Sequence, residues 1–192
     1  EQIGVLLWAV ETIRDQVINV ATALYLLGMQ PQWDHRDMVK AVTPIAGDLL
    51  GRPRIDVLLQ MSALFRDTFP KVALMLDGAV KQAAALDDVA NFVKAHARQI
   101  AKQLEESGTS PDEARARSLG RLFSARPGAY GTKVDKMAAA SGLWESDDAV
   151  AEQGFVEMVS YGYSADAWGR PLKAAYRQNR SHVDATVHTL SS

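Results

Sequence analysis

The chain has 192 residues, of which 47% are hydrophobic and 23% are charged, and its formal net charge is −2. This composition suits one substantial core or two small lobes, and a near-neutral chain without a dense Lys/Arg cluster argues against nucleic acid or a membrane surface as partner. Without cysteine, the chain has no disulfide, thiolate metal site or cysteine nucleophile, which is consistent with a cytoplasmic protein.

The sequence contains no segment that would cross a membrane or serve as a signal peptide. Its apolar runs fall well short of the roughly 20 residues that a spanning helix needs. We therefore expect a soluble protein with no membrane span. Because the chain starts at Glu1 and enters an apolar strand pattern at once, we also expect it to be a piece of a longer chain.

The first predicted element is a buried strand over residues 3–9, followed by a helix over residues 17–27 with apolar residues at helical spacing. Gly28 is a natural end for that helix. Glu11 and Arg14 belong to the polar cluster between the strand and the helix. A strand followed by a helix is half of a βαβ unit, so this cluster stands at a strand end, where such folds bind ligands.

Two further strands are predicted before the middle of the chain. Residues 30–34 form a short candidate strand, with a turn at residues 35–37. Residues 55–59 are apolar and β-branched at their start, which favours a strand covered on both faces, as in a parallel sheet. Because parallel crossovers are right-handed and need covering helices, we predict an α/β fold in which residues 1–88 form a small doubly wound lobe with a parallel sheet.

A second candidate site follows the strand at residues 55–59, where Ser62, Arg66 and Asp67 lie beyond its carboxyl end. The alternative is structural, with Asp67 or Thr68 capping the next helix and Arg66 pairing locally with Asp67. On the residues alone, the structural alternative is favoured. Neither G-x-G-x-x-G nor a P-loop motif occurs, which argues against a dinucleotide or nucleoside triphosphate site in this chain.

The remainder of the chain, residues 89–192, is predicted to be mainly helical. An amphipathic helix covers residues 92–104 and ends by Gly108, and Ser110 begins another helix with a capping-box pattern. His96 lies on the first of these helices without a histidine or carboxylate four residues away. Such a lone histidine is more often structural than a metal ligand.

Residues 119–131 contain two glycines around Tyr130. They would let the backbone approach a ligand, with the phenol as hydrogen-bond donor, or else form a plain turn between helices. Residues 132–140 and 146–159 are then predicted to be helical.

The C-terminal part begins with an aromatic, glycine-rich block at residues 161–171, which could pack against a flat ligand but more often closes a core. Residues 172–190 are predicted to be one helix or an extended segment. His182 and His188 are six residues apart, on different faces of a helix, so a shared metal ion is not expected.

Several motifs together match the pattern of a known family. GRPRIDV at residues 51–57 precedes S-x-x-F-R-D-x-F-P at residues 62–70, WAVETIRD occupies residues 8–15, and LGRLFSARPGAYG occupies residues 119–131. These motifs resemble the large subunit of the cobaltochelatase and magnesium-chelatase family, which inserts a metal ion into a tetrapyrrole. WAVETIRD resembles the cobaltochelatase form, although the family's usual glycine-containing turn is replaced by the pair at residues 16–17.

The resemblance implies a function for the longer chain. It implies an internal fragment of the tetrapyrrole-binding large subunit of an ATP-dependent metallochelatase, a ligase that forms nitrogen–metal bonds. The implied metal substrate is cobalt, the implied tetrapyrrole is a cobyrinate-type corrinoid precursor of cobalamin biosynthesis, and the ATP is bound by partner AAA+ ATPase subunits. A magnesium-chelatase-like, protoporphyrin-binding subunit and a non-catalytic scaffold lobe that docks partners remain alternatives. The fragment alone is expected to be inactive.

The resemblance also assigns roles to particular residues of this chain. The implied site consists of Trp8, Glu11, Arg14, Ser62, Arg66, Asp67 and Tyr130. Glu11 would act as base or transient metal ligand, while Arg14 and Arg66 would bind carboxylate or amide substituents of the tetrapyrrole and Asp67 would orient Arg66. No residue is predicted to hold a resident metal ion.

Overall fold

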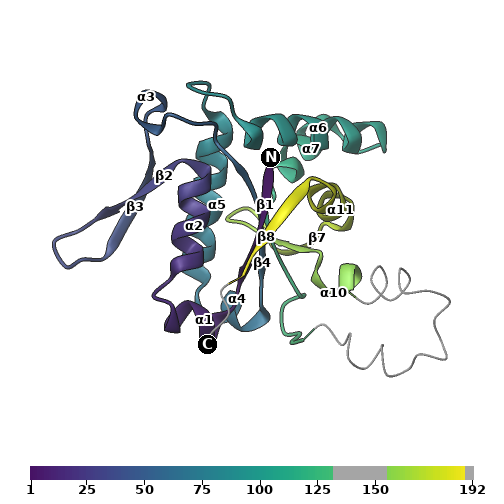
Figure 1. Cartoon of the computed structure of the whole chain (residues 1–192). Helices are drawn as coiled ribbons and strands as arrows, with labels where there is room; N and C mark the ends of the chain where they lie inside the picture. Colours follow the sequence, from purple (N-terminus) through teal and green to yellow (C-terminus); the bar gives the residue numbers. More distant parts are fainter. Residues whose placement is uncertain (132–154, 189–192) are drawn as a thin grey trace.

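The computed structural model describes residues 1–131 and 155–188, which form a mixed α/β fold (Figure 1). Its strands are β1 (Gln2–Leu7), β2 (Met29–Trp33), β3 (Val39–Pro44), β4 (Asp56–Met61), β5 (Leu122–Ser124), β6 (Tyr161–Tyr163), β7 (Trp168–Pro171) and β8 (Val183–Val187). Its helices are α1 (Ala9–Arg14), α2 (Ile18–Leu27), α3 (Gly47–Leu50), α4 (Ala63–Thr68), α5 (Pro70–Ala85), α6 (Phe92–Glu106), α7 (Pro111–Ser118), α10 (Glu157–Val159) and α11 (Lys173–Ser181).

One six-stranded sheet runs through the fold in the order β7–β6–β5–β4–β1–β8. Four neighbouring strands, β5, β4, β1 and β8, are parallel to one another. At the other edge, β6 pairs antiparallel with both β5 and β7. In the central pair, Ile3 of β1 is level with Val57 of β4, and Leu7 is level with Met61. The mostly parallel sheet confirms the predicted α/β class.

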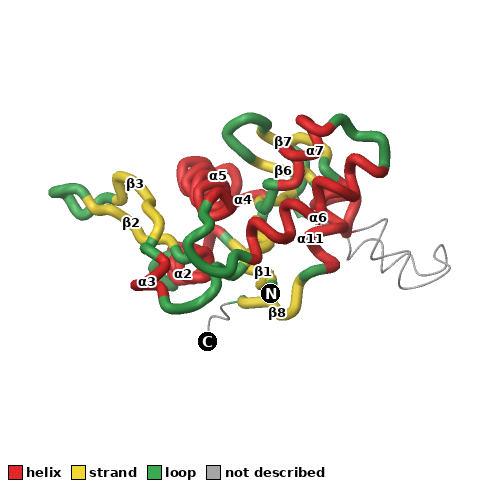
Figure 2. The backbone as a smooth tube through the Cα atoms, turned by 90° about the horizontal axis from the view of Figure 1, so that it is seen from above, coloured by secondary structure: helices red, strands yellow, loops and turns green. Residues whose placement is uncertain are grey.

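Helices cover both faces of the sheet (Figures 1 and 2). On one face, α2 and α5 pack against a core cluster that includes Leu7 and Leu59. On the other face, α10 and α11 enclose a second cluster around Leu58, Phe123 and Tyr176. β4 is therefore apolar on both sides, which explains why its sequence shows a continuous apolar run instead of alternation.

The predicted first strand and first helix are confirmed as β1 and α2. Gly28 ends α2 in the left-handed conformation, with φ of 70°. A Cβ at this position would also lie 2.6 Å from Nη1 of Arg54. The buried Arg54 donates hydrogen bonds to the carbonyls of Leu27 (3.2 Å) and Gly28 (2.8 Å) at the C-terminal end of α2. Only a glycine at position 28 leaves room for this arginine side chain.

The predicted strand at residues 30–34 forms as β2, but its predicted place in a parallel sheet is wrong. β2 pairs antiparallel with β3 in a separate two-stranded sheet, which projects from the body of the molecule (Figure 2). Only Met29 of this strand is buried, and Gln30, Gln32 and Trp33 are exposed. The segment has too little apolar surface for a strand covered on both faces.

Several strands beyond residue 88 were not predicted. β5 lies within residues 119–131, and the segment at residues 172–190 divides into α11 and β8. Strands from both sides of residue 88 share one sheet. The predicted division of the chain into two parts, residues 1–88 and 89–192, remains a prediction.

The two helices predicted after residue 88 form as α6 and α7, and Gly108 follows the first with φ of 90°. Ser110 is the N-cap residue of α7 but makes no capping hydrogen bond with its side chain. The helix predicted at residues 132–140, and most of the one at 146–159, lie outside the described residues. No helix in the described part of the chain is long and apolar enough to span a bilayer.

Candidate functional site

A cavity of about 760 Å³ lies where β1 and β4 end, at the lower end of the sheet in Figure 1. This is the position at which open α/β sheets bind ligands, and the volume suits a large organic molecule. Its walls come from both ends of the chain and are mostly apolar. They include Leu6, Trp8, Val10, Glu11, Met61, Ser62, Leu64, Tyr130, Phe155, Val159 and His188.

The cavity brings together four of the predicted site residues, namely Trp8, Glu11, Ser62 and Tyr130. They come from three separate sequence motifs and meet because β1, β4 and β5 are parallel neighbours. Arg14, Arg66 and Asp67 are not among the residues that line it. The predicted substrate roles of all seven remain predictions.

Glu11 and Arg14 stand on α1, the short helix that follows β1. Glu11 faces the cavity, and its carboxylate lies 3.9 Å from a guanidinium nitrogen of Arg14. Arg14 itself is more than half exposed. A pair this long and this exposed contributes little to stability, so Arg14 is able to turn toward a ligand at the rim.

Ser62 is the N-cap residue of α4, whereas the structural alternative predicted Asp67 or Thr68 as the cap of the next helix. Its Oγ accepts a hydrogen bond from the backbone N–H of Phe65 at 3.0 Å, whereas Asp67 and Thr68 lie inside the same helix. The next helix, α5, starts with Pro70 and has no side-chain cap. Because the cap uses only an oxygen lone pair of Ser62, its hydroxyl hydrogen remains able to donate into the cavity.

Arg66 and Asp67 form a local bidentate ion pair, as the structural alternative predicted. Nε and Nη2 of Arg66 donate to the two carboxylate oxygens of Asp67 at 2.6 and 2.7 Å. This hydrogen bonding holds the pKa of Asp67 below its usual range and raises that of Arg66. Arg66 is completely buried, so its guanidinium group is shielded from the cavity by protein.

The remaining donors of Arg66 hold the segment after β5. Nη1 donates to the carbonyls of Ala125 (2.8 Å) and Arg126 (3.0 Å). From that segment, the hydroxyl of Tyr130 donates back to Asp67 at 2.6 Å. The Arg66–Asp67 pair thus fixes the loop that carries one wall of the cavity, which gives Arg66 a positioning role.

Gln60 lines the cavity from β4 and is held from two sides. Its amide nitrogen donates to the carbonyl of Phe123 at 3.1 Å, and its oxygen accepts from the hydroxyl of Tyr176 at 2.9 Å. Burial raises the pKa of Tyr176 to about 12, so this phenol remains a donor at neutral pH. Gln60 is therefore a rigid part of the floor.

His188 is a cavity residue that the sequence reasoning missed. It follows β8, which pairs in parallel with β1, and its ring contacts that of Trp8 with centroids 6.3 Å apart. The prediction compared His182 with His188 as if both lay on a helix. The signal available in the sequence was the β-branched run VDATV just before His188.

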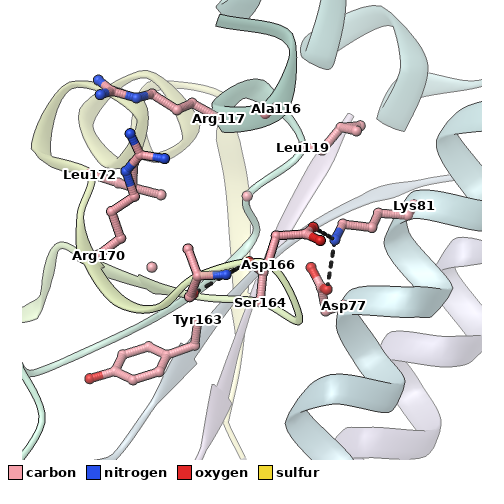
Figure 3. A pocket seen from close by; sticks show the side chains of 13 residues that line it. Asp77, Lys81, Ala116, Arg117, Leu119, Tyr163, Ser164, Asp166, Arg170 and Leu172 are labelled. Atoms are coloured by element: carbon pink, nitrogen blue, oxygen red, sulfur yellow. Dashed lines mark hydrogen bonds and ion pairs between the residues drawn. The ribbon is translucent and has the colours of Figure 1, made fainter. Parts of the chain in front are cut away.

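A second, much smaller cavity of about 90 Å³ lies beside β6 and α5 (Figure 3). Figure 3 shows Lys81 between two carboxylates, at 3.0 Å from Asp77 and 2.5 Å from Asp166. The charges are paired within the protein, and the space is too small for an organic cofactor.

No three or more His, Cys, Asp or Glu side chains cluster into a possible metal site within residues 1–131 and 155–188. His96 is engaged elsewhere, since its Nδ1 lies 2.9 Å from Oδ2 of Asp56 and its ring stacks on that of His182. The prediction that His96 is structural agrees with this arrangement.

Comparison with known proteins places this geometry in a family. The family described as CobN/Magnesium Chelatase matches residues 1–192. The aerobic cobaltochelatase subunit CobN of Pseudomonas aeruginosa is 35% identical over 97% of this chain, and the magnesium-chelatase subunit ChlH of rice is 32% identical over all of it. The structure of the catalytic subunit of cobaltochelatase from Mycobacterium tuberculosis superposes with a TM-score of 0.85 at 32% identity, over 96% of this chain. The chain spans only about 15% of the length of such relatives.

Proposed function

Because the chain belongs to the CobN/magnesium-chelatase family, we propose that it forms part of the tetrapyrrole site of a chelatase large subunit. The observation that carries this proposal is the cavity of about 760 Å³ at the ends of β1 and β4. It has the size and apolar character that a flat macrocycle requires, and residues from three family motifs converge on it.

In this proposal, the aromatic side chains of Trp8 and Tyr130 contact the macrocycle and Glu11 accepts protons from its pyrrole nitrogens. Metal insertion requires the loss of two such protons, and a carboxylate in a mostly apolar site is a suitable acceptor. Arg14 binds a carboxylate or amide substituent at the rim. Ser62 donates its hydroxyl hydrogen, while Arg66 and Asp67 position the loop of Tyr130.

The metal and the partners belong to the same proposal. The resemblance of residues 8–15, WAVETIRD, to the cobaltochelatase form favours cobalt as the metal substrate and a cobyrinate-type corrinoid as the tetrapyrrole. The complex is cytoplasmic, and its AAA+ ATPase subunits bind the ATP. Magnesium with a protoporphyrin is the alternative within the family.

A scaffold role is a second candidate, favoured by one observation. Val10, Ile13 and Ile18 are each more than half exposed on α1 and at the start of α2, and Val10 also lines the cavity. Such apolar exposure is typical of surfaces that another domain or subunit covers. In that case the chain would dock partners without binding a tetrapyrrole.

Titration of a metal-free, hydrogenobyrinate-type tetrapyrrole separates the two candidates. We expect saturable binding, followed by absorbance and Trp fluorescence, that Trp8→Ala weakens roughly tenfold because an aromatic contact is lost. Trp33→Ala is the matched control, since Trp33 is 61% exposed on the β2–β3 hairpin and Trp8 is 50% exposed. Glu11→Gln should leave binding nearly unchanged, yet slow metal insertion roughly 10²-fold in the assembled complex.

Absence of binding at high micromolar concentration, or equal weakening by Trp8→Ala and Trp33→Ala, would contradict the tetrapyrrole site. The scaffold role would then be the better account of this part of the subunit.

A further inference from the structure

His188 reaches the cavity through the pairing of two strands that lie at opposite ends of the chain. β8 runs parallel to β1, and Val187 is level with Val5. His188 is the next residue, so it emerges at the edge of the sheet from which Trp8 and Glu11 also arise.

The exposed imidazole of His188 lies against the ring of Trp8 while its nitrogens remain available. Its ring meets that of Trp8 edge-on, with centroids 6.3 Å apart and an interplanar angle of 61°. This contact uses neither imidazole nitrogen. In the part of the chain that the structure describes, no side chain forms a hydrogen bond or ion pair with His188, in contrast to His96.

The composition of the cavity limits how a metal ion could be held there. Its described lining contains one histidine and one carboxylate, and no cluster of three or more potential ligands occurs in residues 1–131 and 155–188. Within the proposed function, the substrate is the source of further ligands for an ion in this cavity. The ring nitrogens of a tetrapyrrole supply them in one plane and leave the axial positions open.

Resting on the proposed function, we propose that His188 is an axial ligand of the metal ion as it enters the tetrapyrrole. The residue contacts the metal through one imidazole nitrogen, on the side of the cavity that β8 and Trp8 form. This assignment also bears on which metal is inserted. An imidazole nitrogen suits cobalt, whereas magnesium prefers oxygen ligands, so His188 favours the cobalt reaction.

The test uses two probes, metal-free deuteroporphyrin and cobalt(II) deuteroporphyrin. Binding of each probe to this chain is measured under anaerobic conditions. Electron paramagnetic resonance of the cobalt complex should show superhyperfine splitting from a single axial nitrogen. His188→Ala should abolish that splitting and weaken binding of the cobalt complex roughly tenfold, while binding of the metal-free ring changes much less. His35→Ala, in the exposed turn of the β2–β3 hairpin, is the matched control and should retain the splitting.

The outcomes distinguish this inference from the proposed function. Failure of the wild-type chain to bind both metal-free deuteroporphyrin and the metal-free hydrogenobyrinate-type tetrapyrrole would overturn both. Binding without nitrogen splitting would overturn the role of His188 alone and would point to an oxygen ligand such as Glu11. Splitting that persists in His188→Ala would also overturn it and would point to a different axial nitrogen.

Discussion

Gln16 and Val17 form a turn in which two consecutive side-chain-bearing residues have positive φ, at 55° and 64°. They connect α1, which carries Glu11, to α2. A β-branched residue in the left-handed region is a steric outlier that costs about 1–3 kcal/mol. This turn therefore stores backbone strain in the segment between the two helices.

Relief of this strain is testable by Val17→Gly. We expect the free energy of unfolding to rise by about 1 kcal/mol, because the gain at φ of 64° exceeds the entropy that glycine adds to the unfolded chain. Chemical denaturation measures the change. Ile18→Gly is the matched control, since Ile18 is the first residue of α2 and its replacement should instead destabilise the chain. An unchanged or lower stability for Val17→Gly would show that the turn is not strained.

At the scale of elements, α4 and the loop after β5 are joined through Arg66 and Asp67. Arg66 is fully buried and depends on the carboxylate of Asp67 for its charge balance. A buried guanidinium that loses its counter-charge is costly, and the same carboxylate also holds Tyr130. One ion pair therefore links the fold of α4 to the wall of the cavity.

Asp67→Asn tests this link. We expect a loss of about 2 kcal/mol in the free energy of unfolding, because the buried Arg66 loses its charged partner. Tyr130→Phe removes only the hydroxyl that bonds to Asp67 and should destabilise the chain less than Asp67→Asn does. Urea denaturation of both variants measures the difference. Equal effects of the two substitutions would mean that Asp67 acts through Tyr130 and not through Arg66.

At the scale of the whole molecule, a buried polar network ties the amino ends of the strands together. Asp56 accepts hydrogen bonds from Arg121 (2.8 Å) and Gln2 (2.9 Å) and contacts His96 (2.9 Å). Burial alone would raise the pKa of Asp56, but Arg121 and His96 outweigh it and the pKa is lowered. The network therefore keeps Asp56 charged, at the end of the sheet opposite the cavity.

His182 should make the free energy of unfolding depend on pH. Its ring stacks on His96, with centroids 4.6 Å apart. Burial lowers the pKa of His182, and the neighbouring His96 and Arg121 lower it further, against the attraction of Asp56. In the unfolded chain the pKa is about 6.5, so below that pH the unfolded state binds more protons than the folded state.

The free energy of unfolding should accordingly fall as the pH drops from about 7.5 toward 5.5. His182→Phe should flatten this dependence, because phenylalanine keeps a ring for the stack on His96 but does not titrate. His35→Phe, in the exposed hairpin turn, should leave it unchanged. Thermal unfolding followed by circular dichroism at several pH values measures the slope. A slope that persists in His182→Phe would assign the dependence to another group.

Prediction from the sequence was most successful where a local pattern suffices. The apolar run at residues 55–59 indicated a strand covered on both faces, and β4 is the buried centre of the sheet. It was least successful for strand pairing, as the hairpin of β2 and β3 shows. Of the residues that the family resemblance implies for the site, Trp8, Glu11, Ser62 and Tyr130 line the cavity and their roles remain predictions, whereas His188 was not among them.

The sequence by itself determined the α/β class, the helices that glycine and serine delimit, and the strand ends at which polar residues gather, because periodicity and turn chemistry act between near neighbours. Only the tertiary structure decided which strands pair, which arginines are buried and which histidine reaches the cavity. The physical reason is that these outcomes depend on hydrogen bonds and packing between distant segments, such as β1 with β8 and Arg66 with the carbonyls after β5.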